Sequence, residues 1–289
     1  MRVLITGANG TVGTAILNHL GDREEYDFAA IDLDPHPDID TTVADVADYE
    51  AIRPAFDGMD AVIHLAAYPL VDGTWDEVYP PNIQGTYNVL EAAADAGVER
   101  VVFASSIHTV GLYENELAPE LYDPDHPLEI HPHDPVRPDS FYGVSKVFGE
   151  ALGRLYVESS PNPLAELNPA YTTPVWDSPE RFYSLRITSV RSSEYDHPYG
   201  LAEEGVAAGN WERGSEEYQL MADRLKCTWL SHRDCAQLVD RCLQDESVEF
   251  GTYFAVSDND GRWMDIGPTK EELGYDPQDN GAEWDGPPA

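Results

Sequence analysis

The sequence predicts an α/β fold in which a doubly wound parallel sheet is covered by helices on both faces. Three observations support this prediction. Short β-branched segments alternate along the chain with segments of helical pattern. The strand segments are apolar throughout, as expected of strands that are buried on both faces. A glycine-rich turn joins the first strand segment to the first helix, a connection typical of a Rossmann domain.

The predicted elements follow one another in regular order along the 289 residues. Strands are expected at residues 2–6, 28–31, 42–44, 61–67, 101–104, 182–187 and 252–256. Helices are expected at residues 14–20, 49–56, 82–96, 141–157 and 235–244. Proline-rich connections occupy residues 114–140 and 159–180, the second of which has the composition of an insertion, and residues 192–217 form an acidic stretch without clear periodicity. The polar tail from Asp276 onward is expected to fray.

The composition is that of an acidic globular protein. Hydrophobic residues make up 42% of the chain, and 17 Lys+Arg stand against 54 Asp+Glu, a formal net charge of −37. This balance argues against nucleic acid or an anionic membrane face as a partner. One alternative is an acidic surface that binds a partner protein. Because the acidic residues are scattered along the whole chain, we interpret them instead as an adaptation to concentrated salt.

Cysteine and histidine residues do not form a metal-site or disulfide pattern. Cys227, Cys235 and Cys242 are unevenly spaced and contain no CxxC, which predicts buried free thiols. Three histidines fall in the first proline-rich connection, and we predict no metal there: His126, His131 and His133. The chain opens directly on a strand and has no apolar run of membrane-spanning length, which predicts a cytoplasmic protein without a signal peptide.

The glycine-rich turn is a candidate phosphate-binding loop. Gly7 would permit the tight turn, Gly10 would let a pyrophosphate approach the backbone, and Gly13 would let the helix pack closely on the strand. The N-terminus of the following helix would then face the phosphates. A plain glycine turn is the alternative. The cofactor contacts expected here are Gly7, Asn9, Gly10, Thr11, Val12 and Gly13.

Asp32 ends the second strand segment, at the distance from the glycines where a carboxylate accepts hydrogen bonds from the adenosine ribose. No arginine follows it directly, so a 2′-phosphate would meet negative charge. The sequence therefore favours NAD over NADP, which is not excluded, and the alternative is an aspartate that only caps the loop. Further cofactor contacts are expected at Asp45, Val46, Leu65, Ala66, Ala67, Asn82 and Ile187.

Tyr142 and Lys146 are four residues apart in a predicted helix, so their side chains share one face. A tyrosine normally titrates near pH 10, and a nearby cation is expected to lower its pKa. Such a phenolate could take a proton from an alcohol while a hydride leaves the carbon. The alternative is an ordinary helix surface.

In combination, these residues and Ser106 resemble the extended short-chain dehydrogenase/reductase family over residues 1–190. Longer segments are similar to its uronate and aldose 1-dehydrogenases and extend the likeness to residue 280. They are Ser105-Ser106-x-His108-x-x-Gly111, Tyr142-Gly143-Val144-Ser145-Lys146-x-Phe148-Gly149-Glu150, Thr228-Trp229-x-Ser231-His232 and Ser257-x-Asn259-Asp260-x-x-Trp263. The resemblance implies a dinucleotide-binding Rossmann domain over residues 1–190 and a smaller substrate-binding lobe over residues 191–289 that is not an independent domain.

The resemblance also implies roles for matching residues. Tyr142 would be the acid/base, Lys146 its electrostatic partner and a ligand of the nicotinamide ribose, and Ser106 a partner of the reacting hydroxyl. His108 and Ser189 would line the sugar pocket. Arg224 matches an arginine that holds a uronate carboxylate, although a solvated arginine is the alternative.

Two departures from the uronate enzymes leave room for a neutral aldose. Ile107 replaces an amide, and the stretch between Ser189 and Arg224 is longer than the uronate branch needs.

The resemblance implies an NAD-linked oxidoreductase that converts C1 of a cyclic aldose, of the L-arabinose or galactose type, or of a uronate, to the lactone. A nucleotide-sugar epimerase or dehydratase with bound NAD is the alternative, but residues 192–222 are acidic with Arg213 alone as a basic residue, which disfavours a nucleoside diphosphate. A dinucleotide sensor without activity is disfavoured because Tyr142 and Lys146 are both present. The expected partner is a small sugar, and a homo-oligomer stays open.

Overall fold

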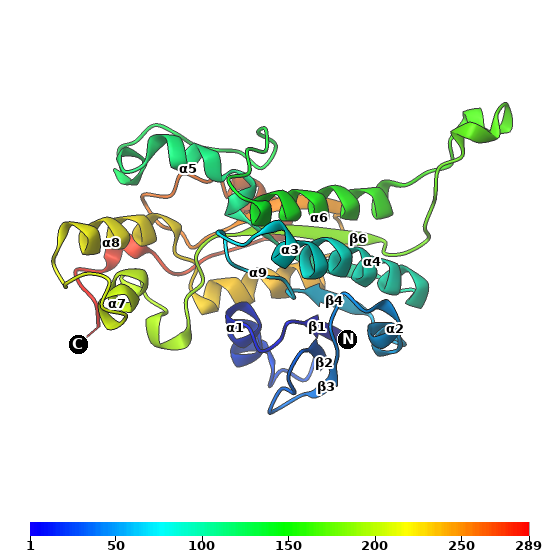
Figure 1. Ribbon diagram of the computed structural model, residues 1–289, viewed down its shortest axis with the longest axis horizontal. Helices are drawn as coiled ribbons and strands as arrows, with labels where there is room; N and C mark the ends of the chain where they lie inside the picture. The colour runs from blue at the N-terminus through cyan, green and yellow to red at the C-terminus, as the bar shows by residue number, and fades with distance from the viewer. Residues whose placement is uncertain (289) are drawn as a thin grey trace.

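A parallel sheet of seven strands forms the centre of the protein, which is described over residues 1–288 by a computed structural model (Figure 1). The order of the strands is β3-β2-β1-β4-β5-β6-β7, and every neighbouring pair is parallel. The predicted doubly wound fold is therefore confirmed. The strands are β1 (Arg2–Thr6), β2 (Asp27–Asp32), β3 (Asp40–Val43), β4 (Ala61–His64), β5 (Arg100–Ser106), β6 (Arg181–Ile187) and β7 (Phe250–Ala255).

Helices pack on both faces of the sheet, and successive residues of one strand are buried against different helices. Val3 of β1 belongs to the same apolar cluster as Ile16 of α1, whereas Leu4 belongs to the cluster that contains Val89 of α4. This two-sided burial explains why the strands are apolar throughout. The helices of these layers are α1 (Thr11–Leu20) and α9 (His232–Gln244) on one face, and α2 (Tyr49–Ile52), α4 (Gly85–Ala96) and α6 (Phe141–Glu158) on the other.

Two predicted helices are shorter than expected, because each adjoins a turn that contains proline. The segment 49–56 is α-helical only as far as Ile52 and continues as a 3₁₀ turn that contains Pro54. The segment 82–96 is preceded by α3 and a π-helical turn with two prolines, and α4 proper begins at Gly85. The remaining short elements are α3 (Trp75–Val78), η1 (Arg53–Phe56), η2 (Tyr79–Gln84), η3 (Ile107–Thr109), η4 (Glu120–Tyr122), η5 (Pro163–Glu166), η6 (Pro169–Tyr171), η7 (Ser193–Tyr195) and η8 (Gly281–Glu283).

A group of further helices forms a lobe beside the carboxyl ends of the strands (Figure 1). No element was predicted over residues 192–217, which lack clear periodicity, but α7 and the start of α8 lie there. Gly205 and Ala202 give α7 a buried face of small residues, against which Trp211 packs, so the helical pattern carries little hydrophobic contrast. The lobe helices are α5 (Gly111–Leu117), α7 (Gly200–Ala207) and α8 (Glu216–Thr228), whereas α10 (Gly267–Leu273) packs against α9 and β7.

Residues 159–180 project from the body of the protein as an arm (Figure 1), as expected of an insertion. The arm holds only two short 3₁₀ turns, η5 and η6. Its apolar side chains are largely exposed, and Leu167 reaches 84% exposure.

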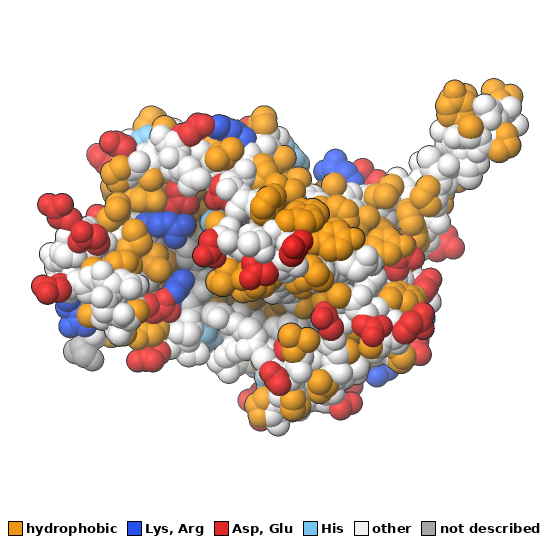
Figure 2. Space-filling view, viewed as in Figure 1, with side chains coloured by type: hydrophobic (Ala, Val, Ile, Leu, Met, Phe, Trp, Pro, Cys, Tyr) orange, Lys and Arg blue, Asp and Glu red, His pale blue; other side chains and the backbone are white. Residues whose placement is uncertain are grey.

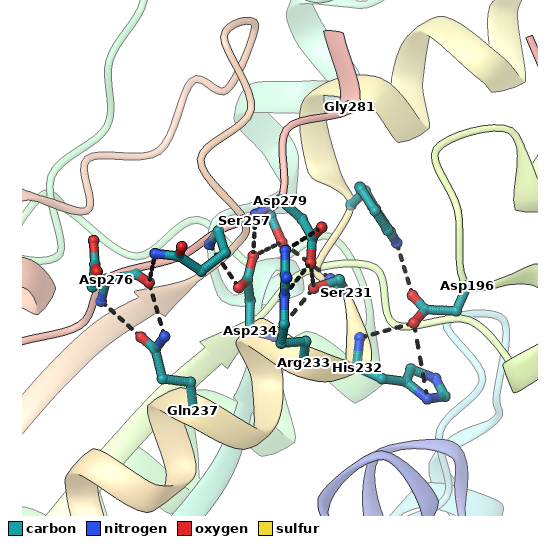
Figure 3. A network of polar contacts seen from close by, with 12 residues as sticks. Asp196, Ser231, His232, Arg233, Asp234, Gln237, Ser257, Asp276, Asp279 and Gly281 are labelled. Atoms are coloured by element: carbon teal, nitrogen blue, oxygen red, sulfur yellow. Dashed lines mark hydrogen bonds and ion pairs between the residues drawn. The ribbon is translucent and has the colours of Figure 1, made fainter. Parts of the chain in front are cut away.

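The polar tail is held in place, so the prediction that it frays is wrong for residues 276–281. The buried carboxylate of Asp234 accepts hydrogen bonds from the backbone nitrogens of Gln278 (2.8 Å) and Asp279 (3.0 Å). Ser231, the N-cap of α9, donates its hydroxyl to Asp279 (2.6 Å), and Arg233 binds the same carboxylate (Figure 3). Charged hydrogen bonds of this kind fix the polar segment, which composition alone does not reveal.

The three cysteines are buried free thiols, as predicted. Burial raises the pKa of Cys227 and of Cys235 to about 12, so neither is a reactive thiolate. Within residues 1–288, no helix combines the length and the apolar character needed to cross a membrane, and no cluster of three metal-binding side chains occurs.

The acidic surface leads to a prediction about salt. Acidic side chains are spread over the visible face of the protein (Figure 2), and the formal net charge is −37. The distance over which charges repel falls from about 10 Å at 0.1 M salt to about 3 Å at 1 M. We expect the unfolding temperature to be lower by at least about 10 °C at 0.1 M NaCl than at 3 M NaCl. Circular dichroism during heating measures it, and equal unfolding temperatures would contradict the salt-adaptation interpretation.

Candidate active site

A cavity of about 890 Å³ lies at the carboxyl ends of the strands, where the chain order reverses between β1 and β4. Its volume is in the range of sites for a cofactor and a small substrate. Most of the predicted site residues lie on its wall, and only Asn9 and Asn82 do not. Those on the wall are Gly7, Gly10, Thr11, Val12, Gly13, Asp32, Asp45, Val46, Leu65, Ala66, Ala67, Ser106, His108, Tyr142, Lys146, Ile187, Ser189 and Arg224.

The glycine turn gives one end of the cavity the shape of a phosphate site. Gly7 has a φ of +77°, and a Cβ atom on it would lie 2.8 Å from the backbone nitrogen of Ala66. A side chain at Gly13 would collide with the backbone of Ala8, so α1 can begin directly against the turn. The N-cap residue Gly10 provides no side-chain cap. The N–H groups of the first turn and the helix dipole are therefore available to an anion in the cavity.

Asp32 is held at the edge of the same end of the cavity. Its carboxylate accepts hydrogen bonds from the backbone nitrogens of Asn9 (2.9 Å) and Leu33 (2.7 Å). The amide of Asn9 donates to the carbonyl of Asp34 (2.9 Å). Asn9 therefore orients Asp32 rather than forming the cavity wall, and the fixed carboxylate suits the hydroxyls of an adenosine ribose.

Replacing Asp32 with alanine tests this end of the site. The dissociation constant for NAD should rise by about tenfold, because charged hydrogen bonds to the ribose are lost, and discrimination against NADP should fall. Isothermal titration at constant salt measures both cofactors. Asp38→Ala, an exposed change of the same type in the following loop, is the control. A wild-type protein that binds NADP much more tightly than NAD would contradict the role of Asp32.

Helix α6 brings Tyr142 and Lys146 to the middle of the cavity. Ser140 caps the helix by accepting a hydrogen bond from the backbone nitrogen of Gly143 (3.0 Å). Gly143 contacts the carbonyl of His108 so closely that no side chain would fit between them. The amino group of Lys146 lies 5.5 Å from the centre of the Tyr142 ring. The two side chains therefore share one face, as their spacing predicts.

Burial controls the titration of this pair. It raises the pKa of Tyr142, an effect that a hydrogen bond with Ser106 partly offsets, and it lowers the pKa of Lys146 to about 7. The prediction that Lys146 lowers the pKa of Tyr142 is therefore wrong for this structure. Both side chains are enclosed, so the cost of removing charge from water outweighs their mutual attraction. The sequence spacing shows the shared face but not the depth of burial.

Ser106 and His108 face the pair from the end of β5. The backbone nitrogen of His108 donates to the Ser106 hydroxyl (3.2 Å), and the His108 ring lies 5.8 Å from the Tyr142 ring, centre to centre. Nδ1 of His108 is 2.7 Å from the carboxylate of Asp139, and this hydrogen bond lowers the pKa of Asp139 although burial opposes it. A neutral His108 then donates through Nδ1 and keeps Nε2 as an acceptor. Asp139 was not predicted, because it is 31 residues from His108 in the sequence and only the fold brings the two together.

Asn82 lies behind the wall of the cavity rather than on it. Its amide accepts a hydrogen bond from the backbone nitrogen of Tyr68 (2.7 Å) and donates to the hydroxyl of Ser145 (3.0 Å). Asn82 therefore does not line the cavity in which its contact with a cofactor was predicted. Tyr68 and Pro81 line the cavity here instead.

The far end of the cavity is formed by the segment after β6 and by α8. The hydroxyl of Ser189 lies 3.1 Å from that of Thr228. Arg224 donates two hydrogen bonds to Glu114 of α5, at 2.7 and 3.1 Å, so its predicted alternative as a solvated arginine is wrong. Arg191 also lines this end. Sequence reasoning missed Arg191 and Glu114, although Arg191 stands only two residues beyond Ser189.

Comparison with known proteins agrees with this geometry. The sequence pattern of the NAD dependent epimerase/dehydratase family matches residues 3–196. The chain belongs to this family. Similar members include two proteins from Haloferax volcanii. An NAD-dependent glucose-6-phosphate dehydrogenase is 36% identical over 98% of this chain and 95% of its own length, and an L-arabinose 1-dehydrogenase (NAD(P)(+)) is 33% identical over 97% and 98%.

Solved structures of the NAD dependent epimerase/dehydratase family extend the comparison. A uronate dehydrogenase variant from Agrobacterium tumefaciens, in complex with NAD, superimposes with a TM-score of 0.71 at 26% identity, covering 100% of this chain and 91% of that one. The predicted resemblance to the extended short-chain dehydrogenases, and to their uronate and aldose branch, is therefore confirmed.

Proposed function

We propose that this protein oxidises C1 of a free cyclic sugar to the lactone with NAD as the hydride acceptor. The observation that carries the proposal is the meeting of Ser106, Tyr142 and Lys146 in one cavity whose other end fits a dinucleotide. Relatives named for oxidation of arabinose, uronates and glucose 6-phosphate support the same reaction type.

Each residue of the triad has a distinct task in this proposal. The hydroxyl of Ser106 holds the C1 hydroxyl of the sugar, and the Tyr142 oxygen takes its proton. As the C1–O bond becomes a carbonyl, the hydrogen on C1 must leave with its electron pair, and a bound nicotinamide would supply the acceptor for this hydride. Lys146 stabilises the phenolate as it forms. His108 orients the sugar ring by accepting a hydrogen bond from a sugar hydroxyl at Nε2. General-base catalysis of this type contributes about 10² to 10⁴ in rate.

The cofactor would be held along the carboxyl ends of the strands. The first turn of α1 would take the pyrophosphate, Asp32 the adenosine ribose, and Asp45 with Val46 the adenine. Lys146 would also bind the nicotinamide ribose. NAD is favoured because a 2′-phosphate beside Asp32 would meet a like charge.

The proposal also assigns different roles to the N-terminal and C-terminal parts of the chain. Residues 1–190 would hold the cofactor and the catalytic groups, and residues 191–289 would add the sugar-binding lobe. The lobe is not independent, because β7 and α9 from this part of the chain pack into the sheet and its layers.

Reduction of NAD in concentrated salt, measured across free aldoses, uronates and aldose 6-phosphates, tests the proposal. We expect NADH formation with at least one free sugar and a lactone as the first product. The control is Tyr142→Phe, which should bind NAD and form little NADH. A wild-type protein that binds NAD but reduces it with no sugar of the panel would refute the proposed function.

A further inference from the structure

At the sugar end of the cavity, Arg224 and Glu114 form an ion pair with each other. Glu114 lies in α5 and is only 6% exposed, whereas Arg224 lies in α8 and lines the cavity. Nε and Nη2 of Arg224 donate to the two carboxylate oxygens of Glu114, at 2.7 and 3.1 Å, and the hydroxyl of Tyr122 donates to the same carboxylate (2.7 Å). This is the bidentate geometry in which a guanidinium binds a carboxylate most strongly.

Arg191, the second arginine at the sugar end of the cavity, is also paired with a carboxylate. Arg191 forms an ion pair with Glu204 of α7. Arg191 and Arg224 are close enough for each to oppose the charge of the other, an effect that adds to burial in lowering the pKa of Arg191. Two arginines therefore face two carboxylates, and these four side chains together carry no net charge.

A cyclic uronate carries a carboxylate at C6, on the C5 atom of the ring, where a neutral aldohexose carries a hydroxymethyl group. To bind Arg224 bidentately through Nε and Nη2, that carboxylate would have to take the place that Glu114 occupies. Binding at Nη1 instead would bring it toward Glu114 inside an enclosed site, where like charges repel strongly. A neutral hydroxyl needs only a single hydrogen bond and brings no charge.

We propose that Glu114 is a specificity-determining residue. It accepts the hydrogen bonds of Arg224 that a substrate carboxylate would need, and it thereby makes the cavity select a neutral aldose over a uronate. The inference rests on the proposed function and names the class of its substrate. Glu114 acts through Arg224 and is a positioning residue, so its removal should change the choice of sugar more than the rate of the chemical step.

The test compares kcat/KM for galactose and galacturonate, which differ only at C6, in wild type and in Glu114→Gln at constant high salt. The wild type should prefer galactose. The glutamine keeps the volume but removes the charge, so Arg224 becomes available, and the ratio of galacturonate to galactose should rise by at least about tenfold, mainly through KM. Glu116→Gln is the matched control, because Glu116 lies in the same helix, is exposed, and binds Arg137 (3.0 Å). Its ratio should stay that of the wild type.

A second variant keeps the test decisive if the glutamine protein does not fold. Glu114→Asp retains the charge with a shorter side chain, and it should retain the preference for galactose. Circular dichroism establishes that each variant is folded. Glucose 6-phosphate completes the panel, because one relative is named for it.

Three results would overturn the inference. They are a wild type that prefers galacturonate or glucose 6-phosphate, a folded Glu114→Gln with an unchanged ratio, and a Glu114→Asp that loses the preference for galactose. These results differ from failure of the proposed function, in which the wild type reduces NAD with no sugar of the full panel of aldoses, uronates and aldose 6-phosphates. That failure would overturn the inference too.

Discussion

Replacing Tyr142 with phenylalanine is expected to lower turnover by at least about a hundredfold, because the ring remains but the oxygen that takes the proton is lost. The affinity for NAD should be nearly unchanged, since the proposed sites for the pyrophosphate and the adenosine ribose lie at the other end of the cavity. Steady-state kinetics and isothermal titration with NAD measure the two effects separately. Near-normal turnover in this variant would refute the proposed mechanism.

The pH dependence of the wild type provides the accompanying control. Burial raises the pKa of Tyr142, so the phenolate is the minor form at neutral pH and becomes more abundant as the pH rises. The rate of oxidation should therefore increase from neutral toward alkaline pH. The phenylalanine variant should lose this increase, and an equal pH profile in both proteins would assign the titration to another group.

Replacing Glu150 with alanine is expected to lower the free energy of unfolding by about 3–5 kcal/mol, because it leaves a buried guanidinium unpaired. Glu150 of α6 binds Arg186 of β6 through two hydrogen bonds of 2.9 and 2.8 Å, and Arg186 is only 3% exposed. Glu150 also accepts a hydrogen bond from Ser105 (2.6 Å), next to Ser106, for which we propose a catalytic role. The ion pair of Glu150 and Arg186 thus stabilises the carboxyl end of β5.

Denaturant unfolding at one high salt concentration measures the effect of the Glu150 substitution. The matched control is Glu158→Ala in the same helix, where the pair with Arg154 is exposed and 3.9 Å long. The control also removes one negative charge, so it corrects for relief of the general repulsion. It should change the free energy of unfolding by about 0.5 kcal/mol or less. Similar losses in the two variants would contradict the role of the buried pair.

The parts of this protein that follow local rules could be predicted from the sequence. The strand, glycine turn and helix at the N-terminus require Gly7 in the left-handed region, and the structure has it there. Tyr142 and Lys146 share a face because helical spacing alone requires it. The strand segments and the parallel order follow from continuous apolar runs that are separated by helices.

The parts that depend on contacts between distant segments could not be predicted. Glu114 and Arg224 are 110 residues apart, and nothing in either segment indicates the other. Asp139 reaches His108 only because α6 begins against the end of β5. The direction in which the pKa of Tyr142 is shifted likewise depends on burial, which is a property of the whole fold.

The fate of the hydrogen on C1 tests the central claim most directly. An aldose that the wild type oxidises is prepared with deuterium at C1 and incubated with NAD, and both products are examined by mass spectrometry. The proposed reaction predicts one deuterium on the reduced cofactor and a lactone without it. Reduced cofactor without deuterium, together with a sugar product that keeps its deuterium at C1, would contradict oxidation at C1.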